Sequence, residues 1–221
     1  MDGVIAALRR YDTPTLSNAI ETFGVRPRDD GFADMSVRCM FPDLAPLVGY
    51  AATATIRARG ATADADQPAL YDHTAATAAP RIVVVQDLDQ PPGHGALWGE
   101  VQSTIFKALG CAGTITDGCV RDLNEVHAIG FQLFARGPCV SHANVRVEEV
   151  GVPVTVGGLT VNTGDLLHAD QHGVLLIPRE IANELPAAAA AVVAREQELL
   201  RWVRSDQFAP ARLSEMRRVP H

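Results

Sequence analysis

The chain has 221 residues, of which 47% are hydrophobic, enough to bury the core of one domain. Nineteen basic and twenty-six acidic residues give a net charge of −7, which argues against a general nucleic-acid partner or an anionic membrane partner. The apolar run 187–194 is far shorter than the roughly 20 residues of a membrane span, and no basic-then-apolar leader opens the chain. We therefore expect a cytosolic protein with one domain over residues 1–204 and a polar tail over 205–221.

The lysine and cysteine residues argue against two further kinds of chemistry. The only lysine is Lys107, which falls on a predicted helix away from its apolar residues and is expected to face solvent. A lysine that forms an imine must be buried to lose its proton near neutral pH, so imine chemistry is not expected. The cysteines lack a CxxC spacing and are read as small buried thiols: Cys39, Cys111, Cys119 and Cys139.

The first part of the chain predicts two helices and then a mixture of strands and helices. The second helix begins at Thr13, which is expected to be its N-cap with Pro14 in the first helical position, and it stops at Gly24. The other expected elements are a helix over 2–10, irregular chain over 26–43 with a short strand near 35–39, a strand with two differently exposed faces over 49–57, a helix over 67–79 and a buried strand over 81–86.

The stretch from Gly93 to Glu125 combines glycine turns, a helix, a strand and charged residues. Its glycines allow a ligand to approach the backbone closely, and the helix expected over Glu100–Leu109 would aim its first amides at that loop. A glycine loop that precedes the N-terminus of a helix is typical of an anion-binding site. Val101, Ile105 and Leu109 recur at helical spacing and predict the buried face of this helix.

After a strand over 113–117 and a helix over 121–129, the pattern changes to short strands. They are expected over 131–136, 144–150, 153–156, 165–169 and 174–177, followed by a long helix over 180–203 that Pro186 shortens or kinks. The sum is an α/β fold whose first half is parallel in appearance and whose second half is antiparallel.

Several common site motifs are missing. Gly93, Gly95 and Gly99 are spaced one residue too widely for the dinucleotide-binding fingerprint, and the chain has no phosphate-loop lysine motif. Ser103 and Ser141 lack the surroundings of a nucleophile elbow.

Two charged motifs remain as candidates. His168, Asp170 and His172 would share one face of an extended chain and could bind a metal, although capping of the turn before Gly173 is the favoured reading.

Arg121, Asp122 and Glu125 lie at a strand-to-helix junction, where open α/β sheets place ligands. On a helix Asp122 and Glu125 would be neighbours, while Arg121 would point about a hundred degrees away. The cluster suits a hard cation beside a carboxylate substrate, and a solvated first helical turn is an equally good explanation of the residues alone.

The segments GALWGE, DGCVRDLNE and GGLTVNTGDLLHADQHGVLLIP resemble the RraA-like family, which includes metal-dependent 4-hydroxy-4-methyl-2-oxoglutarate and 4-carboxy-4-hydroxy-2-oxoadipate aldolases. The resemblance runs from about Thr15 to about Glu196. It implies a swivelling β/β/α sandwich with a single domain, a homotrimer or homohexamer, and a class II pyruvate aldolase that uses Mg²⁺ or Mn²⁺. Oxaloacetate decarboxylation is the implied side activity.

The resemblance also implies roles for individual residues. Arg121 would hold the substrate carboxylate, the amides of Gly99, Glu100, Val101 and Gln102 would bind the pyruvate moiety, and Asp122 would ligate the metal. Glu100 would hold a metal-bound water, and Glu125 completes an acidic pattern that similar aldolases share. The histidine-rich 168–172 stretch exceeds what the family pattern requires, which leaves the natural substrate open.

The small residues 187–191 of the last helix also indicate oligomerisation, because they form a face that can pack closely against another subunit. In similar aldolases a glutamate of the adjacent subunit holds the metal's waters, and Glu196 is the nearest match, with Glu198 as the other choice. The rival functions are a non-catalytic regulator of ribonuclease activity with the same fold, and a different keto-acid lyase or tautomerase.

Overall fold

The structure is a computed structural model that describes residues 2–60 and 67–217. Its α-helices are α1 (Asp2–Leu8), α2 (Thr13–Glu21), α3 (Pro68–Ala76), α4 (Glu100–Ala108), α5 (Leu123–Ala128), α6 (Leu185–Val203) and α7 (Leu213–Arg217). Its strands are β1 (Arg38–Cys39), β2 (Leu47–Arg57), β3 (Arg81–Asp87), β4 (Cys111–Thr116), β5 (Cys119–Val120), β6 (Gln132–Ala135), β7 (Gly137–Pro138), β8 (Arg146–Val150), β9 (Val154–Val156), β10 (Leu159–Val161), β11 (Leu166–Asp170) and β12 (Gly173–Ile177).

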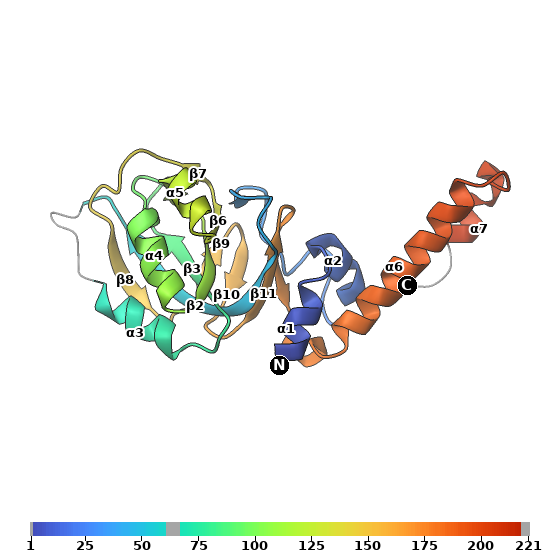
Figure 1. The fold of residues 1–221 in the computed structure, drawn as a ribbon, viewed down its shortest axis with the longest axis horizontal. Helices are drawn as coiled ribbons and strands as arrows, with labels where there is room; N and C mark the ends of the chain where they lie inside the picture. Colours follow the sequence, from blue (N-terminus) through green and yellow to red (C-terminus); the bar gives the residue numbers. More distant parts are fainter. Residues whose placement is uncertain (1, 61–66, 218–221) are drawn as a thin grey trace.

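One large mixed sheet forms the centre of the molecule. Its order is β1-β6-β4-β3-β2-β11-β12, with β8 also pairing with β2. The strands β2, β3, β4 and β6 are parallel to one another, whereas β11, β12 and β8 pair antiparallel. The predicted change from parallel to antiparallel pairing is confirmed for β8, β11 and β12, whereas β6, which was expected in the antiparallel half, pairs parallel with β4. Helices α3, α4 and α5 lie at one end of the body, and α1, α2 and α6 lie at the other (Figure 1).

Strand β2 is buried along both faces, which corrects the expectation of two differently exposed faces. On one face, Ala54 and Ile56 pack in the same core as Phe106 of α4. On the other face, Leu47 and Ala51 pack in the same core as strands β9 and β10. Strand β2 therefore has no open face, and its Thr/Ala alternation reflects small side chains in a crowded sheet.

Both expected N-terminal helices form, with one changed cap. The N-cap of α2 is Asp12, whose Oδ1 accepts a hydrogen bond from the amide of Thr15 at 2.8 Å, and Thr13 is the first helical residue. Leu16 and Ile20 are buried beneath α6, as the predicted apolar face requires.

In the second half, the strand β10 is an addition to the expected elements. Gly157 and Gly158 have φ angles of +55° and +77° and turn the chain between β9 and β10, a conformation that favours glycine. Pro186 lies in the first turn of α6, so it opens this helix and does not kink it.

Helix α6 extends away from the sheet beyond α2, and α7 lies beside its far end (Figure 1). The tail contacts α6 through Trp202 and Phe208, whose ring centroids lie 5.2 Å apart. The domain boundary after residue 204 stays a prediction. In the described part of the chain, no helix combines the length and the apolar character needed to cross a membrane.

Candidate active site

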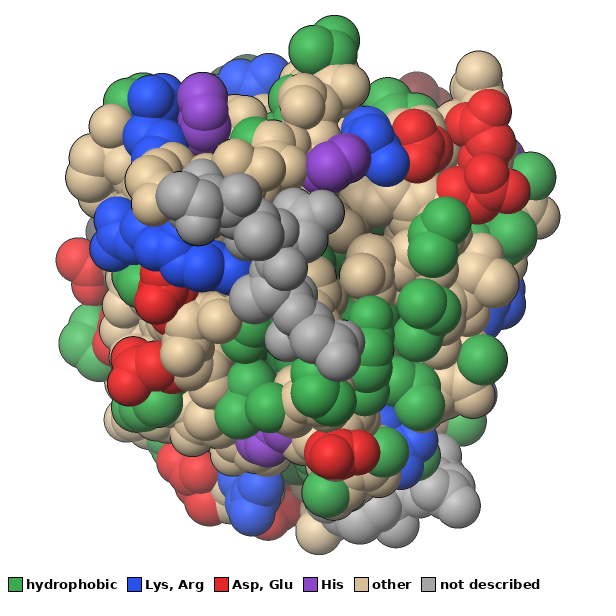
Figure 2. All heavy atoms as spheres, turned by 90° about the vertical axis from the view of Figure 1, so that its left-hand side faces the viewer, with side chains coloured by type: hydrophobic (Ala, Val, Ile, Leu, Met, Phe, Trp, Pro, Cys, Tyr) green, Lys and Arg blue, Asp and Glu red, His purple; other side chains and the backbone are tan. Residues whose placement is uncertain are grey.

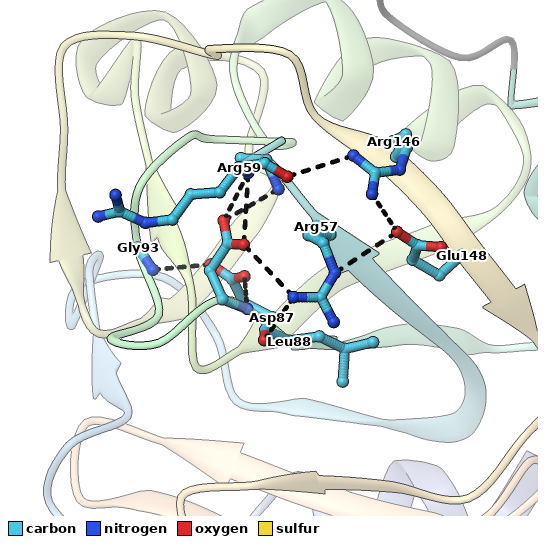
Figure 3. Close-up of polar contacts among 9 residues, drawn as sticks. Arg57, Arg59, Asp87, Leu88, Gly93, Arg146 and Glu148 are labelled. Atoms are coloured by element: carbon cyan, nitrogen blue, oxygen red, sulfur yellow. Dashed lines mark hydrogen bonds and ion pairs between the residues drawn. The ribbon is translucent and has the colours of Figure 1, made fainter. Parts of the chain in front are cut away.

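Acidic side chains at the ends of β3 and β4 hold the glycine loop. Asp87 accepts hydrogen bonds from the amides of Gly93 at 2.7 Å and Asp89 at 3.0 Å, and Asp117 accepts one from the amide of Asp87 at 2.8 Å. Asp89 in turn accepts the amide of Ala58 at 3.0 Å. Figure 3 shows the bond between Asp87 and the amide of Gly93. Gly93 therefore serves a structural turn, because its amide is engaged with Asp87.

These carboxyl groups were not singled out in the sequence, although each lies at or just beyond the end of a buried parallel strand. Loss of solvation on burial raises the pKa of Asp87, and burial raises the pKa of Asp117 to about 6. Their position at the end of a strand was the sequence signal that could have identified these carboxyl groups. Arg57 contacts both Asp89 and Glu148, and Arg146 contacts Glu148, which completes the charged network around them (Figure 3).

Arg121 and Asp122 pack directly against Gly99 at the start of α4. The carbonyl of Trp98 accepts the amide of Arg121 at 2.9 Å, and Oδ2 of Asp122 accepts the amide of Glu100 at 3.0 Å. A Cβ on Gly99 would collide with Oδ2 of Asp122. The glycine loop and the charged junction are thus brought together, as predicted, and Gly99 is required by this close approach.

Asp122 is not a helical residue, which corrects the expected geometry of the charged cluster. Its φ is +54°, α5 begins only at Leu123, and its carboxylate caps α4 and not its own helix. Arg121 Nε lies 3.6 Å from Asp122 Oδ2, so the two side chains do not diverge. Because the helical spacing does not apply, Glu125 is an exposed residue of α5 whose role stays a prediction.

A cavity of about 310 Å³ opens beside this corner. Arg121 and three of the predicted ligand-binding positions, Gly99, Val101 and Gln102, line it together. The amide of Glu100 is already used by Asp122, so the amides that remain for a ligand are those of the neighbouring positions. The other residues that line the cavity are Gln67, Tyr71, Ala96, Leu97, His142 and Val145.

Three of the lining residues are joined by side-chain hydrogen bonds. Tyr71 Oη donates to Gln102 Oε1 at 3.0 Å, and Gln102 Nε2 donates to Gln67 Oε1 at 3.2 Å. The chain fixes the amide of Gln102 and leaves the cavity with polar groups suited to an oxygen-rich small molecule.

The predicted buried face of α4 is wrong. Ser103 and Phe106 are the buried residues, whereas Val101 is 70% exposed and Ile105 is 36% exposed. Helical spacing identified a real apolar stripe, but Phe106 makes an edge-to-face contact with Trp98 and takes the inward position. The end of the molecule that carries α3 and β8 accordingly displays hydrophobic side chains among charged ones (Figure 2).

Asp122 is the oxygen donor that would hold a divalent cation here. Its Oδ2 is engaged by Glu100 and Arg121, so Oδ1 is the oxygen available. Within residues 2–60 and 67–217, no group of three or more His, Cys, Asp or Glu side chains is arranged to hold a metal. Mg²⁺ commonly keeps several waters and uses one or two carboxylates plus substrate oxygens. The corner therefore fits a water-rich ion and does not fit a protein cage.

The 168–172 stretch is an anchor for α2. Asp170 accepts the amides of Thr13 and His172, each at 2.8 Å, and His168 Nδ1 lies 3.1 Å from Thr13 Oγ1. Desolvation lowers the pKa of the fully buried His168 to about 4. Burial opposes the ionisation of Asp170, but its hydrogen bonds outweigh burial and hold its pKa below the ordinary value. The favoured turn-capping explanation is supported by these contacts.

Two further predicted residues lie away from the corner. Glu196 is on α6 and accepts a 3.4 Å hydrogen bond from Asn18 of α2, at the opposite end of the body from α4 and α5 (Figure 1). Lys107 is exposed, as predicted, and its Nζ contacts the carbonyls of Ile129 and Gly130 at the end of α5.

Known proteins resemble this chain in sequence. The family model described as RraA-like, Aldolase/RraA, matches residues 13–176. A protein of Halalkalibacterium halodurans named "Putative 4-hydroxy-4-methyl-2-oxoglutarate aldolase" is 33% identical over 85 residues, which are 38% of this chain and 40% of that protein. The chain spans about half the length of the curated relatives that it matches.

Solved structures share the fold. An uncharacterized protein from Pseudomonas syringae pv. tomato str. DC3000 superposes with a TM-score of 0.76 and 25% identity, covering 98% of this chain and 93% of that one. RraAS2 of Streptomyces coelicolor, described as an unusual member of the RNase ES inhibitor RraA protein family, gives 0.69 and 22%, covering 91% and 96%. The expected RraA-like α/β fold is confirmed, and with residues 13–176 matched the chain belongs to the RraA-like family.

Proposed function

We propose that this protein is a divalent-metal-dependent lyase that cleaves a 4-hydroxy-2-oxo acid to release pyruvate. The observation that carries the proposal is the shared cavity of Arg121 and the first turn of α4, with the Asp122 carboxylate beside it. A guanidinium and free helix amides suit the carboxylate and oxo groups of a keto acid. The names of the aldolase relatives support the same class of substrate.

Each residue has a part in this proposal. Arg121 grips the substrate carboxylate, and the amides of Gly99, Val101 and Gln102 face the pyruvate moiety. Asp122 holds the cation, with Glu100 as the adjacent carboxylate for a bound water. When bound, Mg²⁺ or Mn²⁺ would act as a Lewis acid that polarises the 2-oxo group and stabilises enolate charge. Lys107 contacts the end of α5, which supports a mechanism without an imine.

Oxaloacetate offers the most direct experiment, because its decarboxylation passes through the same pyruvate enolate. Pyruvate release from oxaloacetate and from 4-hydroxy-4-methyl-2-oxoglutarate is measured before EDTA, after EDTA, and after Mg²⁺ or Mn²⁺ is restored. Reactions without protein correct for spontaneous decay of oxaloacetate. We expect chelation to stop both activities and the metal to restore them. Activity that persists in EDTA, or pyruvate trapped on Lys107 by borohydride, would overturn the proposal.

The second candidate is a protein-binding regulator, and the observation that favours it is the exposed apolar side of α4. Val101 and Ile105 leave hydrophobic surface beside the cavity mouth, which is typical of a contact site. The fold likeness to RraAS2 is compatible with this candidate. The same assay separates the two, since a regulator without catalysis releases no pyruvate above the protein-free rate.

We extend the proposal to assembly: the enzyme is a homotrimer or homohexamer whose sites are completed by Glu196, or Glu198, of an adjacent subunit. Within one chain Glu196 lies on α6 at the far end from Asp122 (Figure 1). If this glutamate serves a site, that site belongs to another copy.

Mixing two inactive variants tests the shared site. Asp122→Asn chains are exchanged with Glu196→Gln chains, and subunit exchange is followed by native mass spectrometry. Hybrid trimers should regain activity because some sites receive an intact residue from each chain. Asp122→Asn chains exchanged with themselves are the control. Confirmed exchange without any return of activity, or an active monomer, would contradict the shared site.

A further inference from the structure

His142 was not among the sequence-predicted site residues, yet it is one of the residues that line the same cavity as Arg121. Of the described residues around this cavity, the ones that ionise are Arg121, Tyr71 and His142. A guanidinium does not release its proton in proteins, and the Tyr71 hydroxyl is engaged as a donor to Gln102. Histidine is the side chain suited to exchanging a proton near neutral pH. Among the residues that line the cavity, His142 is therefore the candidate for proton transfer.

The hydrogen bonding of the ring decides which nitrogen faces a ligand. Nδ1 of His142 lies 2.6 Å from the carbonyl oxygen of Ala143, and because a carbonyl only accepts, Nδ1 must carry the hydrogen. In the neutral ring the lone pair is then on Nε2. No hydrogen bond to Nε2 is formed by the described residues. A base with its lone pair uncommitted is thus available at the cavity wall.

The backbone around His142 is fixed by contacts with the glycine loop. The amide of Ala96 donates to the Ser141 carbonyl at 3.0 Å, and a Cβ on Gly95 would come within 2.5 Å of the His142 carbonyl. Ala143 has a φ of +46°, a left-handed conformation that a non-glycine residue keeps only when its surroundings enforce it. Such enforced geometry is the kind of support that positions a reactive side chain.

We infer that His142 is the proton-transfer residue of this site, a conclusion that rests on the proposed retro-aldol function. Nε2 takes the proton of the substrate's C4 hydroxyl while the C3–C4 bond breaks. The C4–O bond becomes a carbonyl, and the electron pair of the broken bond forms the pyruvate enolate. The Nε2 proton is then delivered to C3, which yields the pyruvate methyl group and regenerates neutral His142. Atoms and charge balance without an oxidant or a further reactant.

The two proposed reactions distinguish a role of His142 in proton transfer from a general effect of its substitution on the site. Retro-aldol cleavage needs a base for the C4 hydroxyl, whereas oxaloacetate has no such hydroxyl and loses CO₂ directly. We expect His142→Gln to lower kcat for 4-hydroxy-4-methyl-2-oxoglutarate by about 100-fold or more, the typical contribution of general acid–base catalysis. Oxaloacetate decarboxylation should fall far less. His94→Gln, an exposed histidine outside the cavity lining, is the matched control and should leave both rates unchanged.

A second readout follows the proton itself. Wild-type protein should exchange the methyl protons of pyruvate with deuterium in D₂O, detected by ¹H NMR, and His142→Gln should lose this exchange. His142→Ala should recover part of the retro-aldol rate when imidazole is added. Circular dichroism verifies that each variant is folded. If retro-aldol kcat and methyl exchange are unchanged, or if only KM rises, His142 is not the proton carrier. Wild-type protein inactive on both substrates would instead refute the proposed function.

Discussion

The Arg121–Asp122 corner and the His168–Asp170 turn both place ionisable residues in or next to the last residues of a strand, yet they differ in how their hydrogen-bonding groups are used. The side chains of Arg121 and Asp122 are each 36% exposed, and Arg121 lines an open cavity. His168 is fully buried, Asp170 is 8% exposed, and both contact Thr13. The carboxylate of Asp170 and Nδ1 of His168 are engaged by the fold, and His168 Nε2 is buried without a hydrogen-bond partner among the described residues. This turn is therefore an anchor, while a corner with unused polar groups beside a cavity is a candidate site.

Among the substitutions that test this contrast, we expect the largest loss of activity at Asp122. Asp122→Asn retains an oxygen that can cap α4, but it removes the charge that would hold a cation. We expect kcat for pyruvate release to fall at least about 100-fold, since metal stabilisation of the transition state is worth several kcal/mol. The melting temperature should stay close to wild type. A wild-type rate in this variant would remove Asp122 from the site.

Arg121→Lys should follow with a smaller loss. A lysine supplies a point charge but not the planar pair of donors that grips a carboxylate. A charged hydrogen bond contributes about 2 kcal/mol, so we expect kcat/KM to fall roughly 30-fold, mostly through KM. Steady-state kinetics with oxaloacetate measure this. An unchanged KM would mean that the carboxylate binds elsewhere.

The anchor should show the opposite pattern, a loss of stability without a loss of activity. Asp170→Ala leaves the amides of Thr13 and His172 without their acceptor, and we expect the free energy of unfolding to fall by about 2–3 kcal/mol. Urea titration gives the value, and kcat/KM well below the transition should match wild type. Asp29→Ala, an exposed aspartate in a turn, serves as the control and should change neither quantity. Lost catalysis in folded Asp170→Ala would make the turn part of the site.

The smallest effect is a difference in how the two regions respond to pH. The pKa of His168 is lowered to about 4 by burial, so its contribution to stability is present above its ordinary pKa of 6.5 and is lost as pH falls toward 4. The pKa of Asp117 is raised to about 6 by burial, so its contribution is present below its ordinary 3.8 and is lost as pH rises through 6.

Asp117→Asn isolates the second response. The substituted amide oxygen can still accept the hydrogen bond from Asp87, and the group no longer ionises. The free energy of unfolding of the variant minus that of wild type should therefore increase between pH 4 and pH 6 and then level off. Urea titrations at several pH values measure the difference. A difference that is independent of pH would show that Asp117 ionises normally in the folded protein.

Local sequence patterns were enough to predict the α/β class, most elements, the antiparallel pairing of β8, β11 and β12, and the proximity of the glycine loop to Arg121 and Asp122. These features depend on local signals, namely hydrophobic period, turn residues and strand-end position, which act over a few residues. The matched motifs also pointed to the RraA-like family, which the family comparison confirmed.

Only the tertiary structure decided which apolar stripe is buried and which polar residues remain free. Phe106 displaces Val101 and Ile105 from the core because Trp98 provides its aromatic partner, and Asp122 leaves the helix because its carboxylate meets the amide of Glu100 from another element. The position of His142 at the cavity depends on contacts between two segments about 45 residues apart in the chain. These segments are the Gly95–Ala96 loop and the Ser141–Ala143 turn. Such placements depend on contacts between distant segments, and hydrophobic periodicity carries no information about them.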